Sequence, residues 1–141
     1  MKFAFEYVVN STADGGSLAT AEGLAEVAKA ADELGYSALA LPEHPAPSLK
    51  WLDNGGHETL DPTAALGYVA ALTTRLTILT HLLVVPYRNP FLAAKGLATL
   101  DRLSGGRLMV GVGSGYLSSE FLALGVNFDQ RNSLFDEGLE V

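Results

Sequence analysis

Residues Arg107-Leu-Met-Val-Gly-Val-Gly-Ser-Gly-Tyr116 are the best-specified part of this chain. Their first half predicts a short buried strand, and their second half predicts a glycine-rich turn after it. Directly before them, residues 98–106 (Ala-Thr-Leu-Asp-Arg-Leu-Ser-Gly-Gly) predict the end of a helix closed by two glycines. Glycines in a turn let backbone N–H groups approach a ligand closely. We therefore expect ligand contact at this end of the strands.

Three strand–helix units precede this junction. Runs of apolar and β-branched residues predict the strands, and apolar residues at helical spacing predict the helices between them. Two helices open with Asp61-Pro62 and Asn89-Pro90, in which the first residue caps free N–H groups and proline takes the first helical position. The predicted strands are residues 3–9, 37–42, 76–85 and 108–112, and the predicted helices are 20–34, 61–73, 89–103, 118–124 (capped by Ser118 or Ser119) and a last one from about 131.

Two loops separate the first two predicted strands from their helices. Residues 10–17 contain Asp14-Gly-Gly16 and predict a loop after the first strand. Residues 43–60 form a long connection with early prolines and a late Asn54-Gly-Gly56. Long ordered loops in compact domains tend to be functional or mobile, so we treat the second loop as a candidate wall of a binding site.

The repeating strand–helix order defines the fold class as α/β. Alternating units of this kind imply a parallel sheet with right-handed crossovers. Two architectures remain open on this pattern: an open doubly wound sheet, and half of a (β/α)8 barrel, which usually takes about 250 residues. The last helix has no C-cap at Val141, so we expect the sequence to continue beyond it.

Composition excludes several classes of function. The 141 residues carry a net charge of −7 with only 9 Lys and Arg, which argues against binding to phosphate backbones of nucleic acids. There is no cysteine, which removes disulfides and thiolate metal sites and fits a cytoplasmic protein. Neither a signal peptide nor an apolar run long enough to cross a membrane is present. No His, Asp or Glu cluster has metal-ligand spacing, and Gly113-Ser-Gly115 lacks the nucleophile-elbow pattern.

An ordered series of short motifs resembles the luciferase-like monooxygenase superfamily and, within it, the branch of F420-dependent oxidoreductases from actinobacteria. The series is Leu41-Pro-Glu-His44, Asp61-Pro62, Leu83-Val-Val-Pro-Tyr-Arg-Asn-Pro90, Ala94-Lys95, Ala98 to Arg107, Gly111-Val-Gly113, Glu120-Phe121, Gly125, Arg131 and Phe135-Asp-Glu137. The resemblance implies a TIM barrel that binds a reduced flavin or the deazaflavin coenzyme F420. It also implies that residues 1–141 are the N-terminal half, with the cofactor phosphate commonly held by later loops.

The resemblance also implies roles for single residues after the second and third strands. Glu43 and His44 stand where the family carries an acidic residue and a histidine beside the cofactor ring. His44 is the expected proton donor or acceptor, with Glu43 orienting or tuning it. A non-prolyl cis peptide is expected at about His81–Leu82, against the cofactor ring. Most relatives have a small residue where His81 stands, and a lone histidine in an apolar strand is more often a core residue than a ligand.

The glycine-rich turn is the other expected cofactor contact, through Gly113, Ser114, Gly115 and Tyr116. The alternative is that these glycines serve packing at a crowded barrel top. The spacing of the glycines in this turn is not Gly-x-Gly-x-x-Gly, so we reject a Rossmann dinucleotide site. Around this turn, we expect Arg107 and Glu120 to pair as structural ions. In the long loop, Trp51 and His57 either line a substrate pocket or serve as an apolar anchor and a solvated side chain.

Three functions remain in competition. The first is an oxidoreductase that transfers a hydride between coenzyme F420 and a small organic substrate. The second is a monooxygenase that uses reduced FMN. The third is a non-catalytic half-barrel module that self-associates, because four parallel strands leave two sheet edges uncovered. In each case we expect a homo-oligomer, such as a dimer, joined through exposed edges or helices, with no nucleic-acid or membrane partner.

Overall fold

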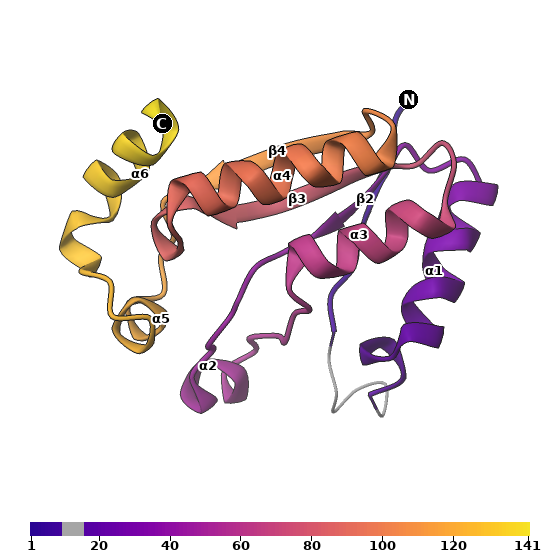
Figure 1. Cartoon of the computed structure of the whole chain (residues 1–141). Coiled ribbons are helices and arrows are strands. Elements are labelled where there is room, and N and C mark those ends of the chain that lie inside the picture. The colour runs from indigo at the N-terminus through magenta and orange to yellow at the C-terminus, as the bar shows by residue number, and fades with distance from the viewer. Residues whose placement is uncertain (10–15) are drawn as a thin grey trace.

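The chain folds around a four-stranded parallel sheet. The computed structural model describes residues 1–9 and 16–141, so most of the loop predicted at 10–17 lies outside the described residues. The sheet order follows the chain, with every neighbouring pair parallel (Figure 1). This confirms the predicted α/β class and the parallel sheet. The strands are β1 (Ala4–Glu6), β2 (Ala38–Leu41), β3 (Thr77–Val84) and β4 (Leu108–Gly113).

Three longer helices connect consecutive strands, as predicted. They are α1 (Ala21–Glu33), α3 (Pro62–Leu72) and α4 (Pro90–Ser104). Side chains cap each start: Thr20 accepts a hydrogen bond from the Gly23 N–H, Asp61 from that of Ala64, and Asn89 from those of Phe91 and Leu92. The C-cap Gly105 of α4 has a φ of 72°, a conformation that glycine adopts without strain. The capping signals in the sequence therefore set these helix starts.

The shorter elements depart from the predictions in three places. The first strand ends at Glu6 rather than residue 9, and Val9 instead forms an isolated antiparallel bridge with Glu58. The long loop contains an unpredicted helix, α2 (Leu49–Asp53), capped by Ser48. Helix α5 (Ser118–Ala123) begins with Leu117 at its N-cap and no side-chain cap, so the predicted serine cap is wrong. The last helix, α6 (Arg131–Glu140), starts where predicted, and 3₁₀ turns occupy Ser17–Ala19, Val85–Tyr87 and Phe128–Gln130.

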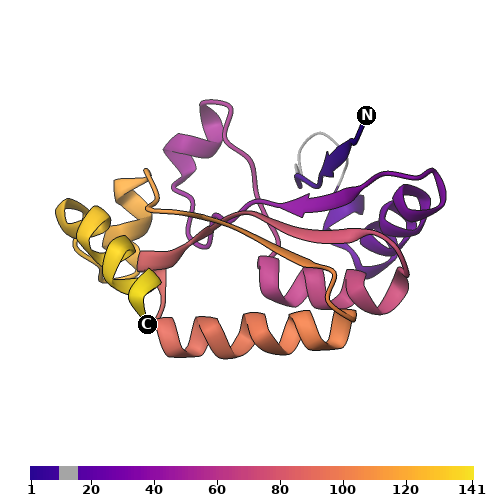
Figure 2. The same cartoon turned by 90° about the horizontal axis from the view of Figure 1, so that it is seen from above.

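The hydrophobic core lies between the sheet and the three longer helices. These helices cover one face of the sheet, as the view in Figure 2 shows. Alternate strand residues point into this layer, and the helices supply the opposing apolar side chains. The core residues include Leu39 and Leu41 of β2, Ile78 of β3, Leu24 and Ala28 of α1, and Leu66 and Val69 of α3.

Sequential strand order with helices on one face decides between the two predicted architectures. A doubly wound sheet reverses its strand order at a switch point and carries helices on both faces, whereas a (β/α)8 barrel adds each strand beside the last. The chain has the second arrangement, so it is a partial barrel of four units. β1 and β4 form the two edges of this sheet. Self-association through these edges stays a prediction.

Arg107 lies at the start of β4 and links three neighbouring elements. Its guanidinium donates hydrogen bonds to the hydroxyl oxygen of Thr73 and to the carbonyl oxygens of Ala70, Leu76 and Ser104, at 2.7–3.0 Å. The predicted pairing of Arg107 with Glu120 is therefore wrong. Arg107 precedes a six-residue strand and Glu120 follows it, and a strand of that length separates its ends by roughly 20 Å.

Candidate active site

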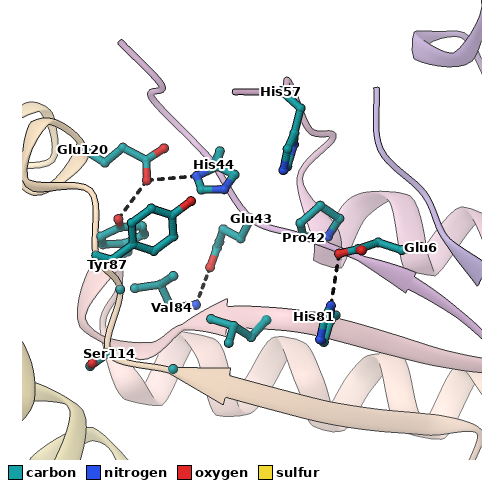
Figure 3. Close-up of a pocket in the computed structure, with 14 residues that line it drawn as sticks. Glu6, Pro42, Glu43, His44, His57, His81, Val84, Tyr87, Ser114 and Glu120 are labelled. Carbon is teal, nitrogen blue, oxygen red and sulfur yellow. Dashed lines mark hydrogen bonds and ion pairs between the residues drawn. The ribbon is translucent and has the colours of Figure 1, made fainter. Parts of the chain in front are cut away.

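A cavity of about 450 Å³ lies at the carboxyl ends of the strands. This is the end of the sheet at which barrel enzymes place their active sites. The cavity brings together the eight residues that the sequence predicted as site residues, from three consecutive strand–helix units (Figure 3). These predicted residues are Glu43, His44, His81, Leu82, Gly113, Ser114, Gly115 and Tyr116. The other residues that line it are Glu6, Pro42, His57, Val84, Tyr87 and Glu120.

The His44 ring faces a buried carboxylate from the start of α5. His44 Nδ1 lies 3.3 Å from Glu120 Oε2, and the Tyr87 hydroxyl donates a hydrogen bond of 2.9 Å to the same oxygen (Figure 3). The Ala46 N–H donates to the other oxygen at 3.4 Å. Burial, and then the bond to Glu120, raise the pKa of the Tyr87 phenol. Tyr87 therefore stays protonated and acts as a donor.

Glu43, the neighbour of His44 in the chain, has different partners. Its side chain accepts a hydrogen bond from the Val84 N–H at 2.6 Å and pairs with the Arg88 guanidinium. Burial raises the pKa of this carboxyl group, although the bonds from Val84 and Arg88 act in the opposite direction. Among the residues that the structure describes, the carboxylate at the His44 ring belongs to Glu120. The predicted orientation of His44 by Glu43 is thus replaced by a contact with Glu120.

His81 and Leu82 are joined by a non-prolyl cis peptide bond, as the resemblance implied. The bond lies at an irregularity in the pairing of β3 with β4, between Thr80 and Leu83. The His81 side chain is 60% exposed, and its Nδ1 lies 3.1 Å from Glu6 Oε1. His81 is therefore a residue of the cavity wall rather than of the core (Figure 3).

The turn after β4 is tightly packed against its neighbours. A Cβ at Gly113 would lie 2.6 Å from Leu82 Cδ1, and one at Gly115 would lie 2.8 Å from Val84 Cγ1. Gly115 also has a φ of 80°. Gly115 is thus required for packing, the alternative that the sequence left open, whereas a Cβ at Gly113 would meet only the end of the Leu82 side chain. Both glycines also line the cavity. Their contact with a cofactor, and that of Ser114, stays a prediction.

Three rings surround His44, two of them from the long loop and one from the turn after β4. Its ring centroid lies 4.5 Å from that of Trp51, 5.1 Å from that of His57 and 5.9 Å from that of Tyr116. Helix α2 carries Trp51, so the unpredicted helix is what brings the indole to His44. The long loop therefore contributes to the site, since His57 also lines the cavity.

Sequence reasoning missed several polar residues of this site: Glu6, Tyr87, Arg88 and Glu120. Each follows or ends a strand, or opens the helix after one. Because the carboxyl ends of parallel strands meet at one rim, that position was itself a usable signal. No group of three or more side chains that could hold a metal ion occurs in the described parts of the chain. No helix of residues 1–9 or 16–141 is long and apolar enough to cross a membrane.

Comparison with protein families identifies the class to which this fold and site belong. Residues 1–141 match the family model of luciferase-like monooxygenases, and the chain belongs to this family. The family resemblance drawn from the motifs is thereby confirmed. The chain spans 45% of the length of the curated relatives that it matches over 128 residues.

Individual relatives differ in the cofactor and reaction that their names record. The F420-dependent glucose-6-phosphate dehydrogenase of Gordonia bronchialis is 35% identical over 101 residues, which cover 71% of this chain and 29% of that protein. The crystal structure of the monooxygenase RslO1 from Streptomyces bottropensis superposes with a TM-score of 0.83 at 31% identity, over 99% of this chain and 41% of that one. The FMN complex of the oxygenating constituent of 3,6-diketocamphane monooxygenase from Pseudomonas putida has a TM-score of 0.82, over 100% and 38% of the two chains; at 19% identity it shows the shared fold alone.

Proposed function

We propose that the full-length protein is an oxidoreductase that transfers a hydride between coenzyme F420 and a small organic substrate. Residues 1–141 would form the N-terminal half of its luciferase-like barrel and supply the part of the site next to the reacting ring. The observation that carries the proposal is the meeting of His44 with Leu82 and the glycine-rich turn after β4 in one cavity at the carboxyl ends of the strands. Membership of the family and the F420-dependent relative support it.

The residues of the cavity fit a planar redox ring. The volume of the cavity, about 450 Å³, lies within the range of roughly 300–1,000 Å³ that is usual for ligand sites. Leu82 and Val84 of β3 offer apolar contact, and Ser114, directly after the neighbouring strand β4, offers a hydroxyl group. These residues and the turn at Gly113 and Gly115 would hold the ring. When bound, the deazaflavin supplies a two-electron hydride donor or acceptor.

His44 would handle the proton that accompanies the hydride. An imidazole is the side chain whose ordinary pKa of about 6.5 suits proton transfer near neutral pH. Its side chain is only 9% exposed, so bulk water has little access to the ring. Trp51 and Tyr116 flank it and limit its rotation. His44 is thus placed to exchange a proton with a group bound in the cavity.

A reduced-FMN monooxygenase is the second candidate, and the similarity to the monooxygenase RslO1 favours it. The two candidates are separated by adding F420 or FMN to the full-length protein and following the fluorescence of each coenzyme. Saturable binding of F420 with no binding of FMN supports the proposal. Binding of FMN alone overturns it in favour of the monooxygenase, and binding of neither favours the non-catalytic half-barrel module.

A further inference from the structure

Glu120 is the most constrained ionisable group of the cavity. Glu120 is 1% exposed, and each of its carboxylate oxygens has a hydrogen-bonding partner. Oε1 faces the N–H of Ala46, and Oε2 faces the Tyr87 hydroxyl and His44 Nδ1. A buried carboxylate is stable only when donors surround it. Ala46 N–H is a fixed donor, and the protonated Tyr87 phenol is a second.

The third partner of this carboxylate must then also be a donor. An ionised carboxylate only accepts hydrogen bonds, and a neutral imidazole has one N–H and one unprotonated nitrogen. If Nδ1 of His44 lacked a hydrogen, its lone pair would face that of Glu120 Oε2 at 3.3 Å. We infer that Glu120 is the positioning residue of His44 and holds the neutral ring in the Nδ1–H tautomer, so that the unprotonated Nε2 is left for the cavity.

The surroundings of Glu120 fix its carboxylate in place. Phe121, the next residue of α5, is completely buried and contacts the rings of Tyr87 and Phe128 at centroid distances of 4.9 and 5.2 Å. On the His44 side, the backbone N–H of His44 donates to the Thr59 hydroxyl at 3.0 Å. Both partners are thus anchored from segments far apart in the chain. A ligand histidine or catalytic histidine is commonly oriented in this way through its second ring nitrogen.

The chemical consequence for His44 rests on the proposed function. With Nδ1 occupied by Glu120, Nε2 can take a proton from a reacting group, and the imidazolium that forms lies beside a carboxylate. The proton leaves the reacting group and is held on Nε2, while Glu120 keeps its charge throughout. Glu120 acts through His44 and has no contact with the reacting atoms in this account. The tautomer itself can be measured without any cofactor.

The test is imidazole nitrogen NMR on the full chain labelled with ¹⁵N-histidine, about two pH units above the ordinary histidine pKa of about 6.5. Residues 1–141 contain three histidines; the signal that disappears in His44→Gln and persists in His57→Gln and His81→Gln is that of His44. We expect the Nδ1–H pattern for His44 in the unmodified protein. An Nε2–H pattern would overturn the inference. This measurement is made on the unmodified protein, so it does not depend on whether a variant folds.

A pair of substitutions then identifies the responsible carboxylate. Glu120→Ala should reduce the Nδ1–H population of His44, whereas Glu43→Gln should leave it unchanged, because Glu43 contacts Val84 and Arg88 instead. The reverse outcome would assign the role to Glu43 and contradict the inference. In turnover assays, Glu120→Gln should lower kcat more than it raises KM. An Nδ1–H tautomer without any F420 binding would keep this inference and refute only the proposed cofactor.

Discussion

The carboxylate of Glu43 accepts a hydrogen bond from the backbone N–H of Val84 at 2.6 Å, so the second residue after β2 is tied to the last residue of β3. The same carboxylate pairs with Arg88 in the turn that follows. Glu43 therefore joins two neighbouring strand ends beneath the cavity. Glu43 contributes to the geometry of the rim, because its carboxylate is bound by a backbone amide and a guanidinium.

We predict that Glu43→Ala lowers the free energy of unfolding by about 1–3 kcal/mol, since it leaves a buried N–H and a guanidinium without their acceptor. Denaturant titration of both proteins measures the difference. Glu33→Ala, on the exposed side of α1, is the matched control and should leave the midpoint nearly unchanged. Equal midpoints for Glu43→Ala and the unmodified protein would contradict the structural role.

His44→Gln should reduce kcat by about 10²–10⁴-fold, the usual contribution of a positioned acid or base. Binding of F420 should change little, because the histidine handles the proton and does not hold the cofactor. Steady-state kinetics and coenzyme fluorescence measure the two effects. His57→Gln, which removes a neighbouring ring of the same cavity, is the control and should have the smaller effect on kcat.

Gly115→Ala should destabilise the protein by about 1–3 kcal/mol, because the new methyl group would overlap Val84 and the buried Phe121 ring at a positive φ. The control is Gly96→Ala in α4, where a Cβ meets nothing within 4 Å. There the substitution should stabilise by about 0.5–1 kcal/mol through helix propensity. Thermal melting of the two variants should therefore shift in opposite directions; equal shifts would refute the packing account of this turn.

Asp32 gives the chain a predictable response to acid. Its carboxylate, on α1, accepts hydrogen bonds from the N–H groups of Thr74, Arg75 and Leu76 at the entry to β3. Burial raises its pKa, but these bonds outweigh that effect and hold the pKa below its ordinary value. A carboxyl group with a lowered folded-state pKa stabilises the fold above its unfolded pKa, here about 3.9, and loses that contribution as the pH falls further.

Asp32→Asn should therefore lower stability at neutral pH by about 0.5–1.5 kcal/mol, because the amide has one acceptor oxygen where the carboxylate uses two for Thr74 and for Arg75 and Leu76. The difference in unfolding free energy between Asp32→Asn and the unmodified protein should narrow as the pH falls below about 4, where the native aspartate takes up its proton. Urea midpoints measured across pH 3–7, a range set by that ordinary carboxyl pKa, provide the check. A stability difference that widens in acid would contradict the lowered folded-state pKa of Asp32.

Arg107→Lys should destabilise the protein by about 1–3 kcal/mol. A single ammonium group cannot reach the four acceptors that the planar guanidinium serves on Ala70, Thr73, Leu76 and Ser104. Arg102→Lys, on the exposed side of α4, is the control. If both variants melt at the same temperature, Arg107 does not hold these elements together.

Much of the fold was predictable because its signals are local. The pairs Asp61-Pro62 and Asn89-Pro90 fix helix starts by capping, and Gly105 permits the turn that ends α4. Helix α2 was missed because it is one short turn within a proline-rich loop, where Ser48 alone marks its start. Local signals of this kind are weakest for elements that tertiary contacts stabilise.

The contacts within the site were less predictable because they join distant segments. Glu43 adjoins His44 in sequence, but neighbouring residues of an extended chain point in opposite directions. The carboxylate at His44 comes from Glu120, 76 residues away. Strand order determines which residues lie at the rim. The packing of the loops determines which of these residues are in contact.

The most direct test of the proposed function is a crystal structure of the full-length protein with F420 bound. We predict that the deazaflavin ring lies against Leu82 and Ser114 in the cavity that His44 lines. A ring bound outside this cavity, or a cavity filled by another part of the protein in the F420 complex, would contradict the account.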